Sequence, residues 1–150
     1  MIIDTSVIVA MIRQESDERR FFEVLRHAST LRVSAATYVE LAVVIDASKD
    51  PISSATLDEL LKTYHVNIEP LTEAQARIAR TAYQQFGKGS GHPARLNMGD
   101  CFAYALARDL GEPLLFKGED FALTDIEIVI EPIKERRLSE VVAAYGAATT

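Results

Sequence analysis

Cysteine and tryptophan are nearly absent from this sequence, which has one cysteine, Cys101, and no tryptophan. A single thiol excludes an intramolecular disulfide and fits a reducing compartment, so we expect a cytoplasmic protein. Aromatic residues make up only 7% of the chain, whereas 48% of the residues are hydrophobic. The core must therefore consist mainly of aliphatic side chains, which is typical of strands that lie between helices.

Basic charge is also scarce, because 16 Lys and Arg face 22 Asp and Glu and give a net charge of −6. This balance argues against a broad, sequence-independent attraction to nucleic acid, which normally requires a basic domain. Residues 87–97 are the exception, since they carry Lys88, His92 and Arg95 and no acid. Their glycines and proline predict a mobile, locally basic loop.

Long hydrophobic runs are missing as well. The apolar start of the chain, residues 1–12, is interrupted by Asp4 and is not preceded by a basic stretch. It resembles neither a signal peptide nor a membrane span, so we expect no association with a membrane.

Short apolar runs of strand length alternate with segments of helical period. The predicted strands are residues 1–4, 31–34, 66–69, 113–116 and 127–130. This alternation predicts an α/β fold, a three-layer α/β/α sandwich with a central parallel sheet of four to five strands. A chain of 150 residues suits a single domain over residues 1–150.

Start and stop signals delimit the predicted helices. Starts are expected at residues 16–17, at residues 53–54, at Thr72, which has capping-box spacing to Gln75, and just after Asn97. Gly111 ends the helix that follows Asn97, and a last helix is expected over residues 138–145. The helix over residues 35–47 is apolar on nearly every side and is therefore predicted to be mostly buried.

The candidate chemistry lies among four acids, because the sequence shows no Ser/His pairing, glycine-rich phosphate loop or Cys/His cluster. Asp4 and Asp120 follow predicted strands, whereas Glu40 and Asp100 lie near the starts of predicted helices. Each has a structural alternative: a helix cap for Asp4, a buried salt bridge for Glu40, a favourable helix dipole for Asp100 and a surface turn for Asp120. Their convergence on one edge of the sheet is the functional signal.

Carboxylates brought so close together would repel one another unless a cation lay among them. Oxygen ligands of this kind suit Mg²⁺ or Mn²⁺. In phosphodiester hydrolysis such a cation activates water and stabilises the leaving oxygen. The residues alone therefore favour a metal-dependent hydrolase.

The whole chain resembles the PIN-domain family, in particular the VapC-type toxins of bacterial type II toxin–antitoxin systems. The resemblance rests on four stretches in order: IIDTS (residues 2–6), SAATYVEL (34–41), NMGDCFAYALA (97–107) and LFKGEDF (115–121), with TDI at 124–126 just after. It implies a Mg²⁺- or Mn²⁺-dependent endoribonuclease that cleaves RNA and is inhibited by a VapB-like antitoxin. The basic side chains of such a partner would be able to occupy the acidic pocket.

The resemblance also assigns the site residues. Asp4, Glu40 and Asp100 match the three most characteristic acids, and Asp120 matches the fourth, with Glu119 as its neighbouring alternative. Ser6 matches a supporting hydroxyl. Asp125 matches a position whose acid reaches the metal through water, with a less certain role.

Two other classes remain open from the sequence. A phosphatase of the haloacid-dehalogenase type would need a second Asp two residues after Asp4, where the chain has Ser6. An inactive binding module would keep the acidic pocket only to receive a partner's basic residue. A homodimer is expected too, from the family and from apolar faces at residues 41–45 and 57–61.

Overall fold

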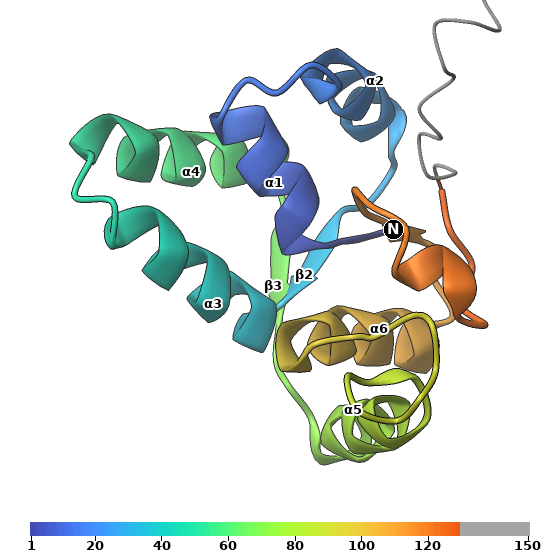
Figure 1. Cartoon of the computed structure of the whole chain (residues 1–150). Helices are drawn as coiled ribbons and strands as arrows, with labels where there is room; N and C mark the ends of the chain where they lie inside the picture. Colours follow the sequence, from blue (N-terminus) through green and yellow to red (C-terminus); the bar gives the residue numbers. More distant parts are fainter. Residues whose placement is uncertain (130–150) are drawn as a thin grey trace, which may run out of the picture.

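The computed structural model describes residues 1–129 and shows short strands alternating with helices (Figure 1). The elements in chain order are β1 (Ile2–Ile3), α1 (Thr5–Ile12), α2 (Glu18–His27), β2 (Arg32–Ser34), α3 (Ala35–Asp46), α4 (Pro51–Thr63), β3 (Asn67–Glu69), α5 (Glu73–Phe86), α6 (Met98–Leu110), β4 (Leu114–Leu115) and the short 3₁₀ helix η1 (Phe121–Leu123). The helix expected over residues 138–145 lies outside the described residues.

The strands form one parallel sheet in the order β3-β2-β1-β4. The predicted fifth strand, residues 127–130, is reduced to one parallel bridge between Leu114 and Ile128, and its last residue lies outside the described part. Because Ile2 is paired with Arg32, Asp4 comes level with Ser34 two residues further along the two parallel strands. The carboxyl ends of β1 and β2 therefore meet at one edge of the sheet.

The sheet separates two aliphatic cores, which confirms the predicted α/β/α sandwich. Ile3 and Leu115 point into a core formed with α1, α2, α3 and α4, whereas Ile2 and Leu114 point into a core formed with α5 and α6. Adjacent strand residues face opposite sides of a sheet, so each two-residue strand serves both cores. Figure 1 shows the two groups of helices on either side of the strands.

The helix boundaries follow local capping chemistry. Asp50 and Pro51, rather than the expected residues 53–54, begin α4: the Asp50 carboxylate accepts the backbone N–H groups of Ile52 and Ser53, and proline suits the first helical position. Thr72 caps α5 by accepting the backbone N–H of Gln75. Gly111 ends α6 in the left-handed conformation, as predicted.

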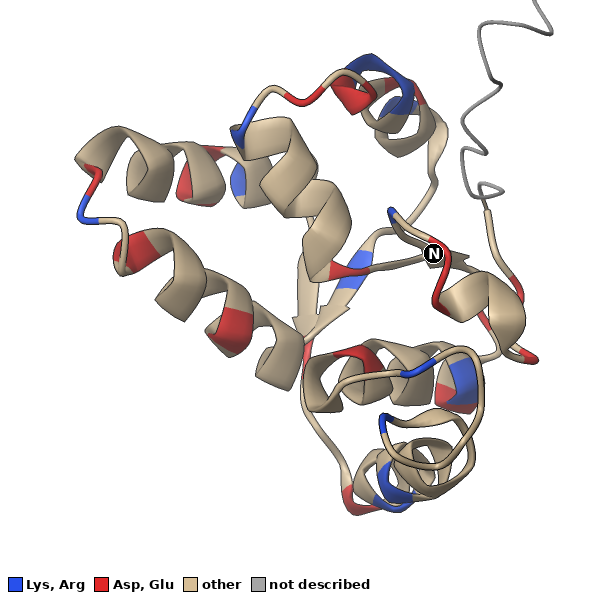
Figure 2. Ribbon diagram, viewed as in Figure 1, with Lys and Arg blue, Asp and Glu red and all other residues tan. Residues whose placement is uncertain are grey.

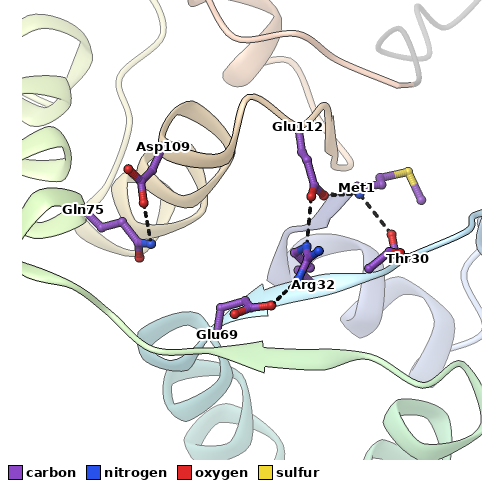
Figure 3. Close-up of polar contacts among 7 residues, drawn as sticks. All are labelled: Met1, Thr30, Arg32, Glu69, Gln75, Asp109 and Glu112. Atoms are coloured by element: carbon purple, nitrogen blue, oxygen red, sulfur yellow. Dashed lines mark hydrogen bonds and ion pairs between the residues drawn. The ribbon is translucent and has the colours of Figure 1, made fainter.

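An ion-pair network joins the amino-terminal ends of β1, β2 and β4 to Glu69 at the carboxyl end of β3. Arg32 of β2 pairs with Glu69 of β3 and with Glu112, which precedes β4, and Glu112 also binds the amino group of Met1 (Figure 3). These contacts connect all four strands through side chains. No helix within residues 1–129 is long and apolar enough to cross a membrane.

Candidate metal centre

The four candidate acids come from four different elements. Asp4 follows β1 and caps α1, Glu40 lies in α3, Asp100 lies in the first turn of α6, and Asp120 directly precedes η1. Figure 2 shows acidic positions at the starts of α1 and α6 and in the first half of α3, around the end of the sheet. The fold thus brings residues that are distant in sequence to one edge.

Asp4 is the most enclosed of these acids, with 4% of its surface exposed. Its Oδ2 accepts hydrogen bonds from the backbone N–H of Ser6 at 3.0 Å and from the Ser6 hydroxyl at 2.6 Å. Burial raises the pKa of Asp4 above its ordinary value although these hydrogen bonds lower it, and the charge of Asp120 raises it further. Asp4 is therefore both a helix cap and an acid held where its negative charge is unfavourable.

Ser6 connects Asp4 to the segment that carries Asp120. Its hydroxyl donates to Asp4 and also accepts the backbone N–H of Lys117 at 3.0 Å. Lys117 lies in the short connection from β4 to η1, so a movement of this connection would also move the hydroxyl that binds Asp4.

Asp100 is held by a reciprocal capping box at the start of α6. The Asn97 side chain accepts the Asp100 N–H at 2.9 Å, and the Asp100 carboxylate accepts the Asn97 N–H at 2.7 Å. Burial nevertheless raises the pKa of Asp100 to about 6, and the charges of Asp4, Asp120 and Glu40 add to this effect. The four acids therefore act on one another electrostatically.

Glu40 extends from α3 toward the start of α6. Its carboxylate lies directly over Gly99, the residue before Asp100. Burial of the carboxyl group and the charge of Asp4 raise its pKa, although the residue as a whole is exposed.

The structure distinguishes Asp120 from its neighbour Glu119. Asp120 contributes to the raised pKa values of Asp4 and Asp100, whereas Glu119 is not among the causes of either shift. Lys117 pairs with neither of these two acids, since its ammonium group binds Glu15 and Asp17.

Asp125 is engaged elsewhere. Its Oδ1 accepts the Tyr104 hydroxyl at 2.7 Å, and its Oδ2 lies 3.3 Å from the Arg108 guanidinium. It is also absent from the causes that raise the pKa values of Asp4, Glu40 and Asp100. The structure therefore connects Asp125 to α6 and not to the four acids.

No cation of the described chain neutralises the four acids. Within residues 1–129, no Lys or Arg side chain forms an ion pair with Asp4, Glu40, Asp100 or Asp120. At the same edge, the hydroxyls of Ser34 and Thr37 are buried without a hydrogen-bond partner among these residues. An uncompensated acidic cluster beside unsatisfied hydroxyls suits a hydrated cation.

The four acids do not form a complete set of metal ligands by themselves. Across residues 1–129, no group of three or more acid, histidine or cysteine side chains is placed so that it could hold a metal ion. Mg²⁺ characteristically keeps several waters and uses only one or two carboxylates directly. An open, oxygen-only set of ligands therefore fits such an ion, with water between the ion and the more distant acids.

The basic loop, residues 87–97, is attached to the protein at both of its ends. Lys88 donates its backbone N–H to Leu96, Leu96 donates to Phe86, and the Ala94 and Leu96 side chains are fully buried. The His92 ring packs edge-on against Phe86, with ring centres 4.9 Å apart. The exposed middle of the loop, residues 89–91, contains two of its glycines.

Asn97 and Gly99 are the contributors to this site that sequence reasoning missed. The spacing of Asn97 and Asp100 is that of a capping box, so this partner was detectable from the sequence. The contact of Gly99 with Glu40 depends on how α3 and α6 cross, and no local pattern indicates it.

The fold and site define a class of α/β proteins in which a carboxylate cluster lies at the carboxyl edge of a parallel sheet. The PIN domain model matches residues 1–127, and the chain belongs to the PIN-domain family. It is 50% identical to Ribonuclease VapC28 of Mycobacterium tuberculosis over 131 residues, which are 87% of this chain and 98% of that protein. It is 48% identical to Ribonuclease VapC42 of the same species over 126 residues, 84% of this chain and 96% of that protein.

A solved structure shows the same fold at much lower identity. A chain of a toxin–antitoxin complex from Klebsiella pneumoniae superposes with a TM-score of 0.66 at 16% identity, covering 88% of this chain and 98% of that one. The family membership and the fold predicted from the sequence are confirmed by these comparisons.

Proposed function

We propose that this protein is a VapC-type endoribonuclease toxin that acts in the cytoplasm and uses Mg²⁺ or Mn²⁺ to hydrolyse RNA. The observation that carries the proposal is the acidic cluster: burial and the charges of neighbouring acids, Asp120 among them, raise the pKa values of Asp4, Glu40 and Asp100, and no cation of the described chain pairs with these acids. The ribonuclease names of relatives that are about half identical over nearly their whole length support the reaction.

Asp4, Asp100 and Asp120 would hold the ion, one or two of them directly and the others through bound water, with Glu40 as a further ligand or as the base that orients water. When bound, the ion activates water and neutralises the scissile phosphate. Ser6 holds the Asp4 carboxylate, and Asn97 holds the Asp100 carboxylate, so that two ligands keep fixed orientations. Asp125 has no direct part in this proposal, because Tyr104 and Arg108 engage its oxygens.

The test uses purified protein, structured RNA and Mn²⁺ or Mg²⁺, with and without a chelator. Asp4→Asn and Asp100→Asn should each lower cleavage by at least about a hundredfold, because each removes a charged ligand. Asp58→Asn is the matched control, since Asp58 is an exposed acid of α4. Undiminished cleavage by the Asp4 and Asp100 variants, or by chelated wild-type protein, would refute the proposal.

An antitoxin partner is the second part of this function. The cleft between α1, α2 and α4 has a volume of about 660 Å³ and an apolar lining that includes Met11, Phe22, Leu60 and Tyr64. Ile52 at its margin is 75% exposed. Such a groove suits an amphipathic segment of a partner, and the acidic cluster would receive a basic side chain of the same partner.

A homodimer is the third part, on the exposed residues of the predicted face 41–45 and their neighbour Val39. Leu41, Ile45, Leu57 and Leu60 are buried in the protein's own core and are not available to a second copy. The helix α3, expected to be mostly buried, instead exposes Val39 at 58% and Val43 at 62%. This unpartnered stripe is the surface on which we propose that two copies pack.

A further inference from the structure

Gly99 is an unusual residue for its position. It is buried in the first turn of α6, where alanine forms a helix more readily than glycine. Its backbone is not in the left-handed region, unlike that of Gly111 at the other end of the same helix, which has a φ of 62°. Backbone conformation therefore does not explain the glycine.

The space beside Gly99 is filled by one side chain. A Cβ atom on Gly99 would lie 2.1 Å from Oε2 of Glu40, 2.5 Å from Oε1 and 2.6 Å from Cδ. The three nearest atoms thus all belong to the end of the Glu40 side chain, and none is backbone. By contrast, a Cβ on Gly111 would meet nothing within 4 Å.

We propose that Gly99 is a positioning residue: the absence of a side chain there allows the Glu40 carboxylate to lie against the start of α6, beside Asp100. This inference rests on the proposed metal-dependent function. The first turn of α6 then orients two acids, because Asn97 holds the Asp100 carboxylate from one side and Gly99 receives the Glu40 carboxylate on another.

A methyl group on Gly99 would displace Glu40 without disturbing the backbone. The Oε2 atom would have to move from 2.1 Å to at least the 3.4 Å of ordinary van der Waals contact. Displacements of about an ångström at a catalytic group are large enough to lower metal binding and activity. The side chain can make this movement because its end is flexible and the residue is exposed on its other side.

The test is a double-mutant cycle on the full chain with Gly99→Ala, Glu40→Ala and the combined variant. Mn²⁺ affinity is measured by calorimetry and Tm by thermal unfolding without metal. Gly99→Ala alone should weaken Mn²⁺ binding roughly tenfold. In the Glu40→Ala background, Gly99→Ala should cause no further weakening of Mn²⁺ binding. Its effect on Tm should there be neutral or stabilising, because the Glu40 side chain no longer fills the space beside Gly99.

Gly111→Ala is the control on the same helix. Its positive φ makes alanine unfavourable there, so it should lower Tm and leave Mn²⁺ affinity unchanged. Glu40→Asp gives a second background, because aspartate holds its carboxylate one methylene further back. In this background Gly99→Ala should lower Mn²⁺ affinity less than it does in the protein that keeps Glu40.

The outcomes separate the two proposals. If wild-type protein and Glu40→Ala bind Mn²⁺ equally weakly, the proposed function fails, and the Tm values still decide whether Gly99 and Glu40 are coupled. If Gly99→Ala binds Mn²⁺ like wild type, or if it lowers Tm equally with and without Glu40, the inference about Gly99 is overturned.

Discussion

Replacing Asp100 by Asn should stabilise the metal-free protein at neutral pH while removing its affinity for the metal. The ordinary pKa of an aspartate is 3.8, and burial raises that of Asp100 in the folded protein to about 6. Between these values the folded state binds more protons than the unfolded state, so stability is lost as pH rises and the loss is complete above about pH 6. Asparagine cannot ionise and escapes this loss, and its side-chain oxygen can still accept the Asn97 N–H.

The size of the effect follows from the two pKa values. At roughly 1.4 kcal/mol per pH unit, they correspond to a ceiling of about 3 kcal/mol. Asp100 is only partly buried, so solvent screening reduces this figure, and the loss of a negative charge in the first turn of α6 offsets part of the gain. A net stabilisation of about 1–2 kcal/mol at pH 7.5 remains, equivalent to a rise in Tm of roughly 2–8 °C.

The assay is urea unfolding of chelated wild-type protein, Asp100→Asn and the exposed-site control Asp58→Asn at pH 5 and pH 7.5. The difference between wild type and Asp100→Asn should be larger at pH 7.5 than at pH 5, and Asp58→Asn should follow wild type. Added Mn²⁺ should stabilise wild type by mass action and leave Asp100→Asn unchanged. An Asp100→Asn protein less stable than wild type at pH 7.5 without metal would refute the reasoning about an unfavourable buried charge.

Three further perturbations address other parts of the molecule. Ser6→Ala removes the hydroxyl that donates to Asp4 and should weaken Mn²⁺ binding roughly ten- to a hundredfold by calorimetry; an unchanged affinity would show that the hydroxyl does not hold the ligand. Arg32→Met breaks the pairs with Glu69 and Glu112 and should lower Tm but leave Mn²⁺ affinity intact, because none of these three residues contributes to the raised pKa values of Asp4, Glu40 and Asp100; a loss of affinity would show that the network and the acids are coupled. Val43→Asp should convert a dimer to a monomer in light scattering, whereas Ile52→Asp should leave the dimer intact and weaken antitoxin binding. If Ile52→Asp disrupts the dimer and Val43→Asp weakens antitoxin binding, the two surfaces have been assigned to the wrong partners.

The sheet and the edge that carries the acids were predictable because their signals are local. Short apolar runs mark β1 and β4, and an acid or polar residue follows each run where the chain leaves the sheet. The end of α6 was equally clear from Gly111. The predicted start of α4 at residues 53–54 is wrong. Two serines resemble a helix start, but Asp50 followed by Pro51 is the stronger start signal and begins the helix.

The details of the site were less predictable because they depend on packing between distant elements. Asp125 lies in the TDI stretch that resembles the family, but Tyr104 and Arg108 on α6 determine what it binds. The exposure of Val39 and Val43 likewise depends on which face of α3 meets the sheet and α4. Composition indicates that α3 is apolar and cannot indicate which side is left uncovered.

The first turn of α6 shows how the fold tolerates an unfavourable site. It contains a glycine that is a poor helix former and an aspartate whose ionisation is opposed by burial. The capping box with Asn97 recovers part of that loss, and the next turns, including Ala103, Leu106 and Ala107, are completely or almost completely buried between the sheet and α5. Because those turns hold the helix in place, its first turn can contain residues that position the acids at the expense of stability. Substitutions that abolish metal binding should recover the stability lost there.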